Sequence, residues 1–119
     1  MGKEVNDPFI LTQLADDKKN ENNFAEAIPI YEKALAGKIQ GLDKVNKKPA
    51  IYYSLAYCGY KLNKFEVSVK ALKDFFAEFP PSDPKYKSLP ALTDFYIKSA
   101  KLYYNVANKV YTDTKSDDD

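Results

Sequence analysis

The residue types that most often carry out chemistry in proteins are scarce in this sequence. It contains no His and no Arg, and its single cysteine, Cys58, has no histidine to remove the thiol proton. Cys58 also falls within a helical apolar pattern, so we expect it to pack as a small apolar residue. Asp16 and Asp17 are adjacent carboxylates, but neighbouring residues of a helix point to different faces. We therefore predict that the protein is not an enzyme.

Metal, cofactor and nucleic-acid sites are not predicted either. The chain has no glycine-rich phosphate loop and no spacing typical of metal ligands. The acidic run at residues 117–119 could attract a divalent cation weakly, but such runs usually only keep a tail solvated. Without Arg the chain lacks the planar donor that reads guanine or holds phosphate through two bonds. We expect no cofactor, no metal and no specific nucleic acid.

The composition predicts one domain with a substantial core, because 45% of the 119 residues are hydrophobic and 14% are aromatic. The net charge of +1 is uneven: residues 41–112 hold 12 Lys against 6 acids, while both ends are acidic. This basic middle could prefer an acidic partner, or its lysines could simply keep the helices soluble.

The chain starts without an apolar leader and has no stretch of membrane-spanning length, so we expect no membrane insertion and a cytoplasmic location, although a segment could precede Met1.

Helical periodicity dominates the chain, and period-two runs of β-branched residues are absent, so we predict an all-α fold. Asp7 and Pro8 suit the start of a first helix, Pro49 is well placed to open a third, and the Pro80-Pro81 pair stops a fourth. The first helix should have a short apolar face of Phe9, Leu11, Leu14 and Ala15, and the fourth an aromatic stripe of Val69, Leu72, Phe75, Phe76 and Phe79. The last helix should bury Leu92, Phe95, Tyr96, Ser99, Tyr103, Val106, Ala107 and Val110. The predicted segments are a lead at 1–7, helices at 8–21, 24–37 (or to 40), 49–62, 65–79 and 89–111, a stiff linker at 80–88 and an acidic, disordered tail at 112–119.

The clearest of these helices is encoded by residues 22–35. Asn23 is placed to accept a hydrogen bond at the N-cap, and Glu26 follows three residues later as in a capping box. Small and large apolar residues then alternate along one stripe, which allows a neighbouring helix to come close. The stripe consists of Phe24, Ala27, Ile28, Tyr31, Ala34 and Leu35.

This pattern recurs 41 residues later, where Leu14-Ala15 overlays Leu55-Ala56 and Phe24 overlays Phe65. An aromatic residue followed by E-A-I and Y-x-K-A-L resembles the second helix of a tetratricopeptide (TPR) repeat. The resemblance covers residues 8–80 as two units, 8–40 and 49–80, and extends loosely to 111. It departs from the family at Lys18 and Gly59, where an aromatic is usual, and at Val67-Ser68, where E-A is usual.

The resemblance implies a single domain over residues 8–111. Its fold would be a five-helix, right-handed superhelical array of two hairpins, with residues 89–111 as a long C-terminal capping helix. It also implies a function, namely binding a peptide or helix of another protein in a concave groove. Because two units are few for such an array, the chain could be a fragment of a larger protein or could self-associate as a weak homodimer.

In this family the first helix of each hairpin lines the groove. Tyr53, Tyr57 and Tyr60 share one helical face, and tyrosines suit a peptide-binding surface. The family's chaperone-binding clamp is not expected, because there is no Arg and the matching positions hold Thr12, Asp16 and Ser54. The groove residues implied by the resemblance are Thr12, Asp16, Lys19, Tyr53, Tyr57, Tyr60, Lys61, Lys101 and Tyr104.

An alternative remains open at this point. The three tyrosines could pack against the last helix, which would then fill the groove. The chain would in that case be a structural or assembly domain of a larger protein or of a homo-oligomer. The exposure of the tyrosines distinguishes the two hypotheses.

Overall fold

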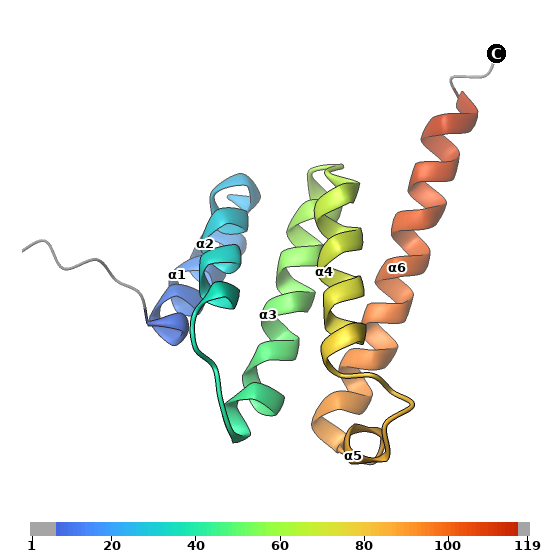
Figure 1. The fold of residues 1–119 in the computed structure, drawn as a ribbon. Helices are drawn as coiled ribbons and strands as arrows, with labels where there is room; N and C mark the ends of the chain where they lie inside the picture. Colours follow the sequence, from blue (N-terminus) through green and yellow to red (C-terminus); the bar gives the residue numbers. More distant parts are fainter. Residues whose placement is uncertain (1–6, 117–119) are drawn as a thin grey trace, which may run out of the picture.

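The computed structural model describes residues 7–116, with side chains to residue 112, and in that range the chain is helical without any strand. An all-α fold is therefore confirmed, with six helices in this range where five were predicted. Successive helices pack side by side, and α6 runs back along both α3 and α4 (Figure 1). The helices are α1 (Pro8–Asn20), α2 (Phe24–Ala36), α3 (Leu42–Lys61), α4 (Phe65–Glu78), α5 (Pro84–Lys87) and α6 (Pro90–Ser116).

Two helical hairpins, α1 with α2 and α3 with α4, are closed by the same three-residue turn. Asn22 and Asn63 occupy the left-handed region in the two turns, with φ of 63° and 59°. The amide after each asparagine bonds back to the helix: Asn23 to the carbonyl of Lys18 and Lys64 to that of Gly59, both at 2.8 Å. This is a Schellman-type helix end, and it recurs at an offset of 41 residues.

The predicted helix starts are confirmed in part. Asp7 caps α1, because its carboxylate accepts a 2.8 Å hydrogen bond from the Phe9 amide. Asn23 precedes α2 as predicted, but its side chain makes no capping bond and donates instead to the Glu26 carboxylate, 2.8 Å away. Pro29 lies inside α2, which continues past it to Ala36.

Three boundaries differ from the prediction. α3 begins at Leu42, so Pro49 lies inside the helix, and residues 42–48, which no predicted helix covered, are helical. The expected stiff linker contains the short helix α5, capped by Asp83. α6 continues to Ser116 and projects past the ends of α3 and α4, so the predicted tail is helical at its start (Figure 1). The rest of that tail, 117–119, and most of the lead lie outside the described residues.

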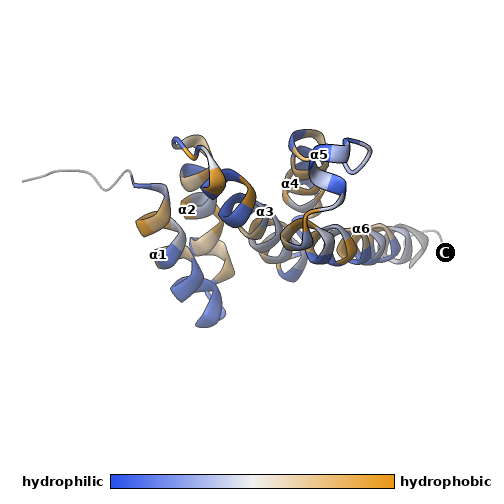
Figure 2. Cartoon of the chain, turned by 90° about the horizontal axis from the view of Figure 1, so that it is seen from below, coloured by the Kyte–Doolittle hydropathy of each residue, from blue (hydrophilic) through white to orange (hydrophobic). Residues whose placement is uncertain are grey.

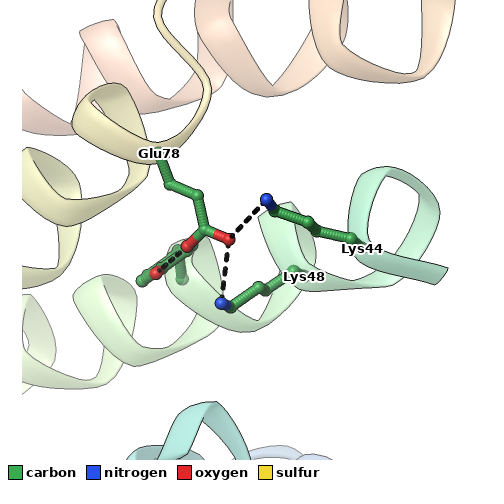
Figure 3. A network of polar contacts seen from close by, with 4 residues as sticks. Lys44, Lys48 and Glu78 are labelled. Carbon is green, nitrogen blue, oxygen red and sulfur yellow. Dashed lines mark hydrogen bonds and ion pairs between the residues drawn. The ribbon is translucent and has the colours of Figure 1, made fainter. Parts of the chain in front are cut away.

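The early start of α3 has a physical cause at its first turns (Figure 3). Lys48 Nζ lies 2.9 Å and Lys44 Nζ lies 3.8 Å from the Glu78 carboxylate at the end of α4. Tyr52 donates a 2.5 Å hydrogen bond to the other oxygen of Glu78. Burial alone would raise the pKa of the Glu78 carboxyl, but these two hydrogen bonds and the two lysine charges hold that pKa below its ordinary value. The cluster joins the start of α3 to the end of α4.

The core follows most of the predicted stripes and departs from them on α1 and α6. Leu72, Phe75 and Phe79 of α4 are fully buried, as the aromatic stripe predicted. On α6, however, Leu102 is buried, whereas Tyr103 and Val110 are exposed, as is Ala107. Leu14, expected on the apolar face of the first helix, is also exposed. Seen from below, hydrophobic and hydrophilic positions alternate along α6 (Figure 2).

Candidate functional site

The tyrosine stripe lies on α3, which contacts α1 on one side and α6 on the other. Tyr53, Tyr57 and Tyr60 are all half-buried, so α6 neither fills the groove nor leaves it fully open. The ring of Tyr53 packs against that of Phe95 on α6, with 6.2 Å between the ring centroids. Tyr57 makes an edge-to-face contact with Phe24 of α2 at 6.1 Å. The stripe is therefore held from both sides, and part of each ring faces solvent.

Two hollows follow the line between α1 and α3, and predicted groove residues line both. The first, of about 380 Å³, contains Lys19, Tyr53 and Tyr57. The second, of about 300 Å³, contains Thr12 and Asp16. The other residues that line them are Asn20, Asn22 and Phe24 in the first, and Phe9, Gln13, Asn46, Lys47, Ala50 and Ile51 in the second.

The structure does not bring every predicted residue to these hollows. From α6, Phe95 lies next to Tyr53, and Lys109 Nζ lies 4.6 Å from the Tyr60 ring centroid. Tyr104 is nine residues from Phe95, about two and a half helical turns, so it points to the opposite side of α6. Tyr104 therefore does not face the groove. Lys101 is exposed and lines neither hollow.

Lysines lie over the aromatic rings of this face, a feature that helical periodicity alone did not reveal. Lys47 lies 5.0 Å from the ring centroid of Phe9, and Lys61 lies 5.9 Å from that of Tyr57. On α6, Lys98 lies 5.4 Å from the centroid of its neighbour Phe95. Among the side chains that the structure describes, none of these lysines, nor Lys109, forms an ion pair with a carboxylate. Their charges are available to an acidic group from outside.

A buried polar network forms the floor beneath the hollows. The fully buried Tyr31 of α2 donates a hydrogen bond to the Asp16 carboxylate, and Lys19 Nζ donates to the Ser54 hydroxyl at 3.3 Å. Burial and the bond to Asp16 raise the pKa of Tyr31 well above its ordinary value, so Tyr31 stays protonated at neutral pH. Asp16 therefore already has a donor, which fixes its carboxylate at the edge of the second hollow.

Cys58 lies close to this network and is completely buried. Burial raises the pKa of the Cys58 thiol to about 11; the positive charge of Lys19 opposes this shift and the negative charge of Asp16 adds to it. The thiol is therefore protonated at neutral pH and poorly placed to act as a nucleophile. Within the described residues no cluster of His, Cys, Asp and Glu is arranged to hold a metal ion.

A third hollow, about 550 Å³, lies on the other side of the molecule and was not predicted. It lies between α2 and α4, whose backbones do not approach each other closely, and part of α3 forms its floor. Its floor is apolar, with Leu35, Leu55 and Ala71, and its rim carries Glu32, Glu66, Asp74 and Lys70. Lys70 is engaged by Asp74 at 2.8 Å, so this hollow is acidic where the α1–α3 groove is basic.

Comparison with protein-family models gives no match, and neither curated proteins nor solved structures show a significant similarity to the chain. Among the described residues, no helix combines enough length with enough apolar character to span a bilayer. Function must therefore be argued from the geometry of the site.

Proposed function

We propose that this chain is a small protein-interaction module of the tetratricopeptide type. Support for the type comes from the turn geometry that repeats after 41 residues and from the neighbour relations of the helices. α3 contacts α1 of the first hairpin, and α6 contacts α3 of the second. In a right-handed superhelical array, α1, α3 and α6 are the helices that line the concave face.

The proposed ligand is an acidic, amphipathic peptide or helix of a partner protein, bound along the groove between α1 and α3. The single observation that carries this proposal is the set of lysine–aromatic pairs without carboxylate partners. Lysine charges favour Asp and Glu on the ligand, and the half-buried rings of Tyr53 and Tyr57 favour its apolar side chains. Electrostatic complementarity of this kind mainly speeds encounter and selects the partner.

Individual residues have distinct roles in this proposal. Lys47 lines the second hollow, and Lys61, which lines neither hollow, lies over the ring of Tyr57 beside the first; both receive carboxylates of the ligand. Lys19 is held at the first hollow by its bond to Ser54, and Asp16 at the second by Tyr31, so both present fixed polar groups. A fixed group loses less conformational entropy on binding than a mobile one.

A second function is favoured by the contacts of α6. Because Phe95 and Lys109 cover part of Tyr53 and Tyr60, α6 could be the natural occupant of this face. The chain would then be a structural or assembly domain, and the groove would bind nothing from outside. Ligand binding to the groove separates the two functions.

The test uses three fluorescein-labelled 15-residue peptides with the same helical apolar pattern, whose polar positions are all Glu, all Gln or all Lys. Fluorescence anisotropy should show tightest binding of the Glu peptide, and this binding should weaken with added salt. The double variant Lys47→Glu/Lys61→Glu should bind the Glu peptide with an affinity that is lower by about tenfold or more. Each exposed cationic contact contributes only a small factor to the affinity, and this variant reverses the charge of two of them.

The matched control is Lys38→Glu/Lys73→Glu, which makes the same change in net charge at two exposed lysines that line neither hollow. Its affinity should stay close to that of the wild type. Equal loss in both double variants would show that net charge alone attracts the peptide. If no peptide binds above background, the structural function takes precedence.

A further inference from the structure

The last helix carries a second apolar stripe that the fold does not use. Its inner stripe, with Leu92, Leu102 and Val106, is buried against α3 and α4. On another side of the helix, Tyr104 is 70% and Ile97 is 53% exposed. The exposed positions recur at three- and four-residue steps, as one face of a helix requires. This outer stripe consists of Ile97, Ala100, Tyr103, Tyr104, Ala107 and Val110, all of them exposed.

The outer stripe is uncharged in a chain whose residues are 29% charged. By helical geometry the two lysines of α6 that lie over aromatic rings, Lys98 and Lys109, are on the other side of the helix. Monomeric proteins rarely leave a contiguous apolar patch of this kind uncovered. A charged partner would find nothing to pair with here, so the occupant must itself be apolar.

The order of residues points to that occupant, because the stripe reads nearly the same in both directions. Around the midpoint between Tyr103 and Tyr104, Ala100 mirrors Ala107, and Ile97 mirrors the β-branched Val110. An antiparallel pair of identical helices related by a twofold axis at this midpoint places each residue opposite its mirror position. Apolar residues would then meet apolar residues, and the two alanines would let the helices approach closely.

We infer that two copies of this chain associate through their α6 helices, antiparallel, with the twofold axis at Tyr103 and Tyr104. A fully buried tyrosine covers about 200 Å², so the exposed parts of the six residues amount to roughly 400–500 Å² per copy. The pair would bury about 800–1,000 Å², which is below the range of standard stable interfaces and within that of weak, transient ones, so we expect a weak dimer with a micromolar Kd. The groove between α1 and α3 is not part of this interface and stays open.

Sedimentation velocity of the full chain between about 1 and 200 μM tests the inference. The wild type should shift from monomer to dimer across this range, and Ala100→Lys should remain monomeric, because two lysines would enter the interface. Lysine is a good helix former, so α6 should keep its circular dichroism. Asn105→Lys, an equal charge change at an exposed position outside the stripe, should dimerise as the wild type does.

The antiparallel arrangement has its own test. Position 100 of one copy faces position 107 of the other, so Ala100→Lys and Ala107→Glu chains should each be monomeric alone and form a mixed dimer when combined. In a parallel pair, position 100 would face position 100, and mixing would not restore association. A monomeric wild type at 200 μM, a dimeric Ala100→Lys variant or a mixture that stays monomeric would each overturn the inference.

Discussion

In both hairpins the chain reverses direction within three residues, through an asparagine in the left-handed region and the same set of backbone hydrogen bonds. The interiors that these turns connect are different. At equivalent positions the first hairpin places the hydroxyl-bearing Tyr31 and the second the purely apolar Leu72, both fully buried. The turn depends on a few local bonds and therefore repeats, whereas helix packing depends on distant contacts and diverges. The second hairpin therefore forms the tightly packed centre of the fold, and its helix α3 contacts the neighbouring helices.

The sharpest difference between the hairpins is at Gly59 and its equivalent, Lys18. A Cβ at Gly59 would lie 2.8 Å from Ser68 Oγ and 2.9 Å from the Lys64 carbonyl oxygen, both closer than real contacts allow. Gly59→Val should therefore lower the free energy of unfolding by about 3 kcal/mol. Urea denaturation followed by circular dichroism measures this loss. Lys18→Val, at a partly exposed position, should change it by less than about 1 kcal/mol.

Comparable losses in the two variants would mean that α3 and α4 are no more closely packed at this point than α1 and α2. Gly59→Ala offers an intermediate step. Its methyl group meets the same atoms, but alanine favours the helix by about 1 kcal/mol over glycine, so the net loss should be smaller than for valine.

The second-largest effect concerns the Tyr31 hydroxyl, which the first hairpin buries at the position where the second has Leu72. Tyr31→Phe removes the hydroxyl that donates to Asp16 and should destabilise the protein by about 1–2 kcal/mol, because the carboxylate loses its donor. A double-mutant cycle with Asp16→Ala should give a coupling energy of about 1 kcal/mol. Additive effects of the two substitutions would show that the bond contributes nothing to stability.

The Glu78 cluster is the counterpart of this bond in the second hairpin. The folded protein holds the pKa of Glu78 below its ordinary value, so the folded state releases this proton more readily than the unfolded chain does. The resulting stability is present above the unfolded pKa of about 4.3 and is lost as the pH falls through the lower folded value. Glu78→Gln should therefore cost about 1–2 kcal/mol at pH 7, and the gap from the wild type should narrow below pH 4.

Unfolding curves at pH 7, 5, 4 and 3 measure this gap. Glu66→Gln, at an exposed carboxylate for which the described side chains provide no ion pair, should follow the wild type at every pH. A gap for Glu78→Gln that stays constant with pH would show that the carboxylate's charge is not what stabilises the hairpin.

These contacts explain which parts of the fold could be predicted from the sequence. The helix that starts at Asp7-Pro8 and the α4 stripe depend on local signals, and both were predicted correctly. The predicted start of α3 was wrong. Proline usually occurs in the first turn of a helix, so Pro49 was expected to open α3, whereas the ion pairs that extend the helix join residues 30 or more apart in the sequence. For α6, periodicity showed apolar positions but did not tell the inner stripe from the outer one, so Tyr103 and Val110 were wrongly expected to be buried.

The candidate site was predicted less completely than the fold. Spacing along one helix is a local property, so the tyrosine stripe could be derived from residues 53, 57 and 60 alone. The hollows, by contrast, depend on where α1 comes to lie against α3. The lysine–aromatic pairs that cross from α6 to α3, such as Lys109 over Tyr60, depend on the crossing of two helices far apart in sequence. The acidic hollow between α2 and α4 likewise depends on how helices far apart in the sequence pack together.

The smallest expected effects concern the shared turn and sharpen the comparison. Asn22→Gly and Asn63→Gly should each change the free energy of unfolding by no more than about 0.5 kcal/mol, because glycine adopts the left-handed conformation freely while adding entropy to the unfolded chain. Because φ and the backbone bonds match at the two turns, the two variants should also agree with each other within experimental error. A clear difference between them would mean that tertiary packing, and not the local bonds alone, sets the energy of the turn.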